Sequence, residues 1–411
     1  MKQIILTFKN LFQNKTRFIL LAELLTLFII TFGFLIYIAY TNTLNGDERE
    51  HIYASYLVHN GYIPYRDFFE HHHPLLWYLF QPIICFFINN ANIWYAARTF
   101  SLFLILINCF FLFKISRLIL PSSDYPWLTL ILSVCPHCVF ISQTEFRPDA
   151  LMMTTYISGI YYYFLAIKTA EQKHLTIAFI LFFLSLMTLQ KICFLILPVV
   201  ILTFYLIHRH IFSLKNIIKA CIIPLTLATA YLGYLYATDA LKDYFELNWL
   251  LNTKIHFGIQ YPVHQTYYYY LENTLSLIAL FSAKNQTLRY TAFIGLCLSL
   301  ILQYIFLGAF RHYWLPIYPF FALITAYYIV ILPQKLKIIC LACIIYPIFT
   351  NNLKYKEELS HYTSLSSFTY LTQNVLNLSH PNDLIIGCIG SLGGLRLDAT
   401  GYYWFGRNYV A

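Results

Sequence analysis

Long apolar runs separated by short polar segments dominate the sequence. Roughly 20 predominantly apolar residues are needed to cross a bilayer as a helix, and in lipid every backbone polar group must be paired within the protein. Eleven runs approach this length, at about residues 18–41, 98–117, 126–142, 150–167, 175–190, 192–208, 217–238, 267–282, 290–309, 313–332 and 336–350. The pattern therefore predicts an all-α polytopic membrane protein with about 11 transmembrane helices.

The apolar run from Leu175 to Ile207 is too long for a single crossing. Its 33 residues would form a helix of about 50 Å, whereas a hydrocarbon core is about 30 Å thick. The polar break within it is Gln190-Lys191, and both ends of the run are basic. The run is therefore expected to fold back, which places Lys191 at the opposite membrane face. A lone lysine at that face is also typical of a snorkelling anchor.

Composition and charge agree with a membrane protein and give it an orientation. Only 11% of the residues are charged, against roughly 25% in soluble domains. The 27 Lys and Arg residues lie singly or in pairs at the ends of apolar runs, not in the basic stripe of a nucleic-acid-binding protein. With the N-terminus inside, the inner segments carry a net charge of +13 and the outer segments −3. This distribution follows the positive-inside rule and predicts an outer C-terminus.

The same assignment predicts two parts, a transmembrane domain over residues 1–350 and a small extracytoplasmic tail over 351–411. The domain includes a long first outer loop at 42–97 and a second outer loop at 239–266. An apolar segment at 74–89 is interpreted as a juxtamembrane helix at the headgroup level, because counting it as a span would invert every downstream charge assignment. In the tail, a helix is expected near 364–378 and a strand at 383–387.

The first outer loop holds the most conspicuous candidate chemistry. Asp47 and Glu48 lie within a few residues of the first predicted span, and membrane-proximal carboxylates in a chain so poor in charge are functional candidates. A carboxylate there can act as a general base toward a hydroxyl. His71, His72 and His73 could form a metal cluster, but adjacent histidines rarely converge on one ion, so a phosphate contact is favoured and no metal site is predicted.

Two further outer clusters combine charged and aromatic residues. They comprise Glu145, Arg147 and Asp149, and Arg311, His312 and Tyr313. Asp149 could simply cap the following helix, where a carboxylate is worth about 0.3 to 1 kcal/mol. An aromatic belt would explain Tyr313 but explains Arg311 less well.

The order of these features resembles the C-type membrane glycosyltransferases, in the branch that contains protein O-mannosyltransferases and lipid A aminoarabinose transferases. The resemblance covers residues 1 to about 350. It is carried by the Asp47-Glu48 pair, G-x-x-P-Y-R-D at 61–67, H-P-L at 73–75, R-P-D-A-L at 147–151, Gln190-Lys191, and H-Y-x-L-P at 312–316.

The resemblance implies transfer of a hexose or pentose from a polyprenyl-phosphate donor on the extracytoplasmic face, with inversion at the anomeric carbon. It implies that Asp47 is the catalytic base, with Glu48 beside it, and that Asp149 shapes the acceptor or sugar site. His73 and Lys191, and more weakly Arg311, would bind the carrier phosphate. The remaining candidates are Arg66, His72, Arg147 and Tyr313.

The partners expected from this resemblance are the lipid-linked sugar donor, membrane lipids and an envelope acceptor, which could be lipopolysaccharide, another glycan or lipid, or a protein. No nucleic acid and no cofactor are expected, although a divalent metal stays open. The expected location is a bacterial inner membrane, with the site facing the periplasm or exterior.

Two alternatives share the substrate class. A transporter or flippase of a lipid-linked saccharide usually places ionisable groups near the midplane and often shows repeated halves, whereas the charges here are peripheral. A lipid-linked polysaccharide polymerase would be favoured by a large outer loop late in the chain, whereas the acidic loop here is early.

Overall fold

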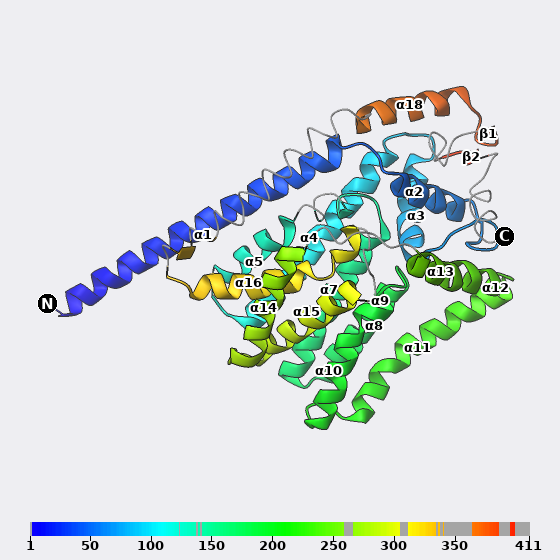
Figure 1. The fold of residues 1–411 in the computed structure, drawn as a ribbon. Coiled ribbons are helices and arrows are strands. Elements are labelled where there is room, and N and C mark those ends of the chain that lie inside the picture. Colours follow the sequence, from blue (N-terminus) through cyan, green and yellow to red (C-terminus); the bar gives the residue numbers. More distant parts are fainter. Residues whose placement is uncertain are drawn as a thin grey trace.

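The computed structural model describes residues 2–122, 124–136, 139, 142–258, 266–304, 311–333, 336–337, 340, 364–385 and 395–398, with the side chains of 2–20, 255–258, 266–269 and 311 outside this description. The described chain is almost entirely helical (Figure 1). Within the described ranges, five helices or helix segments are long and apolar enough to cross a membrane, namely Leu21–Thr41 within α1 (Lys2–Thr41), α4 (Ile93–Ile119), α7 (Pro148–Thr169), α11 (Leu214–Ala237) and α15 (Gln286–Tyr304). The molecule is a multi-pass membrane protein, and the count of 11 spans stays a prediction.

Shorter apolar helices fill the space between these long ones. They are α5 (Tyr125–Val134), α8 (Gln172–Leu186), α9 (Ile192–Leu195), α10 (Leu197–His208), α14 (Thr266–Ser282) and α16 (Tyr318–Ile331). Prolines set several of their ends, because proline lacks the N–H that an interior helical position must donate. Thus α5 stops before Pro136 although the apolar pattern continues to residue 142, and α10 and α16 have Pro198 and Pro319 as their second residues, where no helical N–H is needed. The predicted span at 336–350 lies almost entirely outside the described residues.

The predicted fold-back of the run 175–207 is confirmed. α8 ends at Leu186, five residues including Gln190 and Lys191 turn the chain, and α9 and α10 return beside α8. Side chains of both arms, such as Phe182 and Val199, line one shared apolar cavity.

The first outer loop contains two helices, α2 (Gly46–His59) and α3 (Leu75–Phe87). α3 coincides with the segment interpreted as a juxtamembrane helix. Its 13 residues would extend about 20 Å, too little to cross a hydrocarbon core of about 30 Å. Together α2, α3 and the start of α4 surround a core of large apolar side chains that includes Trp77, Phe80 and Trp94.

The second outer loop is also helical, with α12 (Leu241–Asp243), a π-helix η1 (Tyr244–Leu250) and α13 (Leu251–Gly258). In the tail, the expected helix is α18 (Leu365–Leu378), which begins where the Ser364 side chain accepts a hydrogen bond from the Ser367 amide. The expected strand is β1 (Leu384–Ile385). It pairs in parallel with a second strand, β2 (Leu397–Asp398), which the sequence pattern did not predict.

The tail packs against the first outer loop (Figure 1). Trp94 Nε1 donates a hydrogen bond to Thr372 Oγ1 at 3.2 Å, and the Ala91 amide donates to Gln373 Oε1 at 3.0 Å. Leu365 of α18 is fully buried in the same core as Trp77. The tail and the early loop therefore share one apolar core.

The close approach of α7 and α8 depends on a glycine. A Cβ atom at Gly159 would lie 2.6 Å from the ring of Phe182, whereas one at Gly233 in α11 would meet nothing within 4 Å. Overpacking a tight interior costs about 1–3 kcal/mol. We therefore expect Gly159→Ala to lower the thermal unfolding temperature of the detergent-purified protein. Gly233→Ala is the matched control and should leave it unchanged or slightly raised, and equal melting of the two variants would contradict this packing.

Candidate functional site

A buried ion pair holds the junction between α1 and α2. Both carboxylate oxygens of Glu48 accept hydrogen bonds from Arg98 of α4, at 2.9 and 2.6 Å, and both side chains are almost completely buried. Glu48 also accepts from the backbone amides of Asn45, at 3.1 Å, and Phe146, at 3.0 Å. The predicted catalytic candidate Glu48 is thus fully engaged within the protein.

Arg98 uses its other guanidinium donors on the end of α1. Its terminal nitrogens donate to the carbonyls of Ala39, Asn42 and Thr43 at 2.7 to 2.9 Å. The last carbonyls of a helix have no partner within the helix, so a buried helix end needs such a donor. Arg98 was not among the sequence candidates, because in sequence it is one charge at the edge of an apolar run.

Asp47 faces a different direction from Glu48 and is the accessible carboxylate of the pair. Its side chain is 47% exposed, and Oδ2 lies 2.5 Å from Nη1 of Arg147. Arg147 is almost buried and also approaches Glu145 at 3.6 Å and Asp149 at 3.5 Å. The structure therefore brings together the first and second predicted outer clusters.

Local sequence explains how Arg147 and Asp149 are presented. Arg147 precedes a proline and is extended, with φ −132° and ψ 153°, as a pre-proline residue prefers. Pro148 then starts α7, so Asp149 lies in the first helical turn, where a carboxylate is favoured by the helix dipole. Asp149 therefore lies in the first turn of α7 and also contacts Arg147.

Asp149 connects this group to the α8–α9 turn. Its Oδ1 pairs with Nζ of Lys191, and both side chains are buried. The Lys191 ammonium lies 4.8 Å from the centre of the Tyr313 ring, and Arg147 Nη2 lies 3.4 Å from His312 Nε2. Asp47, Arg147, Asp149 and Lys191 thus form a continuous chain of alternating charges, closed on one side by η2 (Arg311–Trp314).

Glu145 lies beside this chain and has an altered protonation equilibrium. Burial and the neighbouring Glu48 carboxylate raise its pKa to about 7, despite Arg147 and a hydrogen bond from Asn45. The site consequently contains a carboxyl group that binds a proton near neutral pH.

The segment from Tyr65 to His73 is clamped against the second outer loop. Tyr65, in the left-handed region with φ 72°, donates its hydroxyl to the His72 carbonyl at 2.7 Å. Asn248 of η1 donates to the same carbonyl at 2.8 Å, and Gln190 donates to the His71 carbonyl at 2.7 Å. The two residues of the predicted Gln190-Lys191 motif therefore have different partners. Gln190 contacts the first outer loop, and Lys191 contacts Asp149.

His73 is buried between the rings of Tyr244 and Trp249, whose centres lie 5.6 and 5.7 Å from its own. Neither ring nitrogen has a hydrogen-bond partner among the described residues. Burial, with a contribution from His72, lowers the pKa of His73 to about 3. At neutral pH it can offer a phosphate one N–H donor but no positive charge.

Two other candidates lie apart from this chain of charges or beyond the described side chains. Arg66 pairs with Asp67 at 2.7 Å and donates to the Thr238 carbonyl at 3.0 Å, at the end of α11. The side chain of Arg311 lies outside the description, so its predicted phosphate contact stays a prediction.

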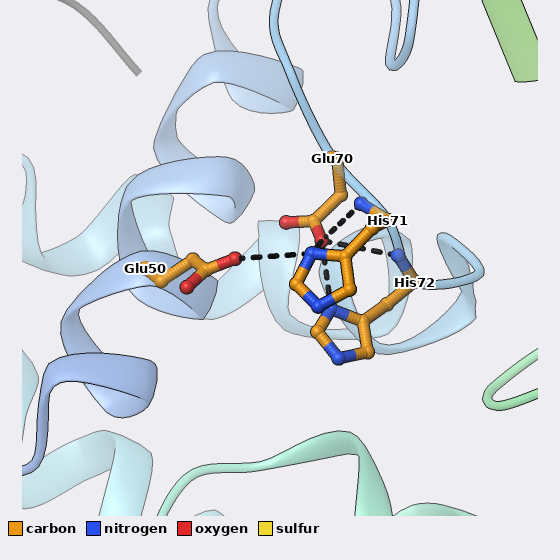
Figure 2. Close-up of side chains that lie close together, drawn as sticks. All are labelled: Glu50, Glu70, His71 and His72. Atoms are coloured by element: carbon orange, nitrogen blue, oxygen red, sulfur yellow. Dashed lines mark hydrogen bonds and ion pairs between the residues drawn. The ribbon is translucent and has the colours of Figure 1, made fainter. Parts of the chain in front are cut away.

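The predicted candidate His72 belongs to a second cluster with Glu50, Glu70 and His71 (Figure 2). One ligand-type atom from each of the four lies within 4.8 Å of the others. Glu50 and Glu70 were not sequence candidates, because their contact depends on how the loop returns to α2.

Comparison with known proteins supports the fold. No family model and no curated protein sequence matches the chain. Among solved structures, it is similar to ArnT from Cupriavidus metallidurans bound to undecaprenyl phosphate, with a TM-score of 0.59 and 10% identity over 86% of this chain and 69% of that one. It is also similar to an Archaeoglobus fulgidus oligosaccharyltransferase in complex with Zn and sulfate, with a TM-score of 0.51 and 10% identity over 93% of this chain.

The present chain spans 57% of the oligosaccharyltransferase. At such low identities the similarity concerns the fold alone. The chain therefore shares the fold of these structures, as the resemblance predicts.

The burial of Glu48 and Arg98 leads to a stability prediction. Removing one partner of a buried ion pair costs about 3–5 kcal/mol, because the other charge is left uncompensated. We expect Glu48→Gln to lower the thermal unfolding temperature strongly in detergent. The control is Glu171→Gln, whose carboxylate is 46% exposed and pairs with Lys173 near the start of α8. If Glu48→Gln melted like the control, the ion pair would have no structural role.

Proposed function

We propose that the protein is an inverting glycosyltransferase that moves a sugar from a polyprenyl-phosphate donor to an acceptor hydroxyl. The observation that carries the proposal is the chain of alternating charges from Asp47 to Lys191, which adjoins an apolar cavity. An amphiphilic donor with an anionic head and a hydrocarbon tail matches both parts. The fold shared with ArnT, whose structure was solved with undecaprenyl phosphate, supports the same class of donor.

The cavity has a volume of about 250 Å³ and lies between α8, the α9–α10 arm and α11. Ile192 and Cys193, which follow Lys191 directly, contribute to its wall. The other lining residues are Phe179, Phe182, Phe183, Leu186, Ile196, Val199, Val200, Thr203 and Pro224. A prenyl chain placed here would contact the two residues that directly follow Lys191.

In the proposed reaction Asp47 is the base. Its carboxylate accepts the proton of the acceptor hydroxyl while that oxygen forms a bond to the anomeric carbon, and the bond from this carbon to the phosphate oxygen breaks on the opposite face. Polyprenyl phosphate leaves with the electron pair of the broken bond. Among the site carboxylates, Asp47 has the greatest exposed fraction, which suits a group that must reach an incoming acceptor.

The cations have the complementary task. Negative charge grows on the leaving phosphate, and preorganised cations in a poorly solvated site stabilise such charge most effectively. Lys191 and Arg147 are almost buried and held by Asp149, so little reorganisation is needed. Asp149 and Glu48 are positioning residues in this scheme, and His73, Arg311 and Tyr313 are secondary contacts to the donor.

The proposed setting is a bacterial inner membrane, with the N-terminus inside and the site facing the periplasm or exterior. The acceptor is an envelope glycan, lipid or protein, and lipopolysaccharide is one member of that class. The orientation rests on the distribution of charge along the sequence, and the membrane and the acceptor class rest on the resemblance to C-type membrane glycosyltransferases.

Asp47→Asn tests the base. Loss of general-base catalysis typically costs 10²–10⁴-fold in rate, so we expect transfer to fall by about 10²-fold or more. Envelope glycolipids and glycoproteins from a deletion strain carrying the wild type, Asp47→Asn or Glu171→Gln would be compared by mass spectrometry. The mass added by the wild type should be missing with Asp47→Asn and present with the control. Full restoration by Asp47→Asn would refute the assignment, and would favour a transporter of a lipid-linked saccharide.

Lys191→Ala tests the phosphate contact. A hydrogen bond to a charged group is worth about 1.5–3 kcal/mol, so we expect polyprenyl phosphate to bind about tenfold more weakly or worse. Polyprenol has the same chain without the phosphate, and its binding should change little. Lys173→Ala, at a side chain that is 69% exposed, is the matched control. If the variant kept the wild-type preference for phosphate over polyprenol, Lys191 would be reduced to an interface anchor.

A further inference from the structure

We propose that Glu50, Glu70, His71 and His72 form a binding site for a divalent cation of the zinc class. Two imidazole nitrogens and two carboxylates are the ligand types that zinc prefers, usually in tetrahedral sites. The proposal goes beyond the glycosyltransferase assignment and does not depend on it.

The distances between the ligand atoms suit one ion. Metal–ligand bonds of about 2.0–2.2 Å in a tetrahedron place the ligand atoms about 3.4 Å apart. His71 Nδ1 lies 3.8 Å from Glu50 Oε1 and 3.7 Å from Glu70 Oε1, and His72 Nδ1 lies 2.7 Å from the same Glu70 oxygen. All separations among the four ligand atoms are within 4.8 Å. Figure 2 shows the four side chains converging from α2 and from the segment 70–72.

Adjacent histidines converge here because the backbone that carries them is irregular. The rings of His71 and His72 lie side by side with centres 3.9 Å apart, and both present Nδ1 toward Glu70. The amides of His71 and His72 donate to Glu70 Oε1 at 2.8 and 3.1 Å, which folds the short segment around its own carboxylate. The expectation that neighbouring histidines diverge does not hold for this turn.

The proposed ligands are also held from outside. Glu70 is fully buried. The carbonyls of His71 and His72 are fixed by Gln190, Asn248 and Asn252, the last donating to His71 at 2.7 Å. Partners that orient the ligands contribute strongly to metal affinity, commonly 10–100-fold. A bound ion would connect α2 to the segment 70–72, and through it to the second outer loop.

This connection would also position the candidate base. Asp47 and Glu50 are three residues apart on α2 and therefore lie on the same side of the helix. An ion held by Glu50 would fix the first turn of α2, and with it the direction of Asp47. The ion's role in this proposal is to order these elements, and the reaction step described above does not involve it.

The test measures metal alone, using full-length protein purified in detergent without a polyhistidine tag. After EDTA treatment and gel filtration, the protein is incubated with Zn²⁺, filtered again and analysed by elemental mass spectrometry. We expect one retained Zn²⁺ per chain, with a rise in unfolding temperature that Mg²⁺ does not produce, since a ligand that binds only the folded state stabilises it.

Glu70→Gln and His72→Ala should lose retained zinc, and Glu50→Gln, at the more exposed side chain, should bind it more weakly. Glu171→Gln and His174→Ala, on residues near the start of α8, are controls that should keep it. Co²⁺ substitution in the wild type should give the visible absorption of a tetrahedral site, which does not depend on the folding of any variant. Absence of stoichiometric zinc in the wild type, or equal retention in Glu70→Gln and the controls, would overturn the proposal and leave a network of histidine–carboxylate ion pairs.

Discussion

The Glu48–Arg98 ion pair is the contact on which the arrangement of the site depends. Arg98 satisfies three carbonyls at the end of α1, while Glu48 caps the start of α2 and accepts the amide of Phe146 just before α7. The positions of α1, α2 and α7 relative to one another therefore depend on one buried pair of charges. Burying two charges is costly, so the pair adds little net stability. Its main effect is to favour this one arrangement of the helices, in which all its hydrogen bonds are made.

Fixing Glu48 also fixes its neighbour. Successive residues of a helix differ in direction by about 100°, so a buried Glu48 leaves Asp47 directed elsewhere, where it meets Arg147 and solvent. Two adjacent carboxylates thereby acquire different roles, one within the protein and one accessible. Asp47 and Glu48 are adjacent in sequence and form one motif, but they differ in burial and in partners.

The remaining buried charges of the site, as far as their side chains are described, each have a partner of opposite sign. Arg147 lies between Asp47 and Asp149, and Lys191 pairs with Asp149 while lying over the ring of Tyr313. This alternation of sign allows several charged side chains to lie in a poorly solvated region. An anionic ligand there would interact strongly with the Arg147 and Lys191 side chains. The clamp formed by Asn248 and Gln190 on the His71–His72 segment brings the second outer loop to the same region.

The class of fold follows from the sequence alone, because a bilayer imposes a length and a polarity that any spanning helix must show locally. The same is true of the fold-back at Gln190-Lys191, the helix at 365–378, and the candidates Asp47, Asp149 and Lys191, whose charges stand out in an apolar chain. Helix breaks at Pro136 and Pro198 were not anticipated, although their cause is local.

Which charges meet one another, in contrast, is set by contacts between distant segments. Arg98, Asn248 and Glu50 acquire their roles from contacts across 50, 176 and 21 positions. Glu70 acquires its role from a short segment that folds around its own carboxylate. Hydropathy and local propensity report the environment that a residue requires, but they contain no information about its distant partner. That choice depends on the packing of all the helices together.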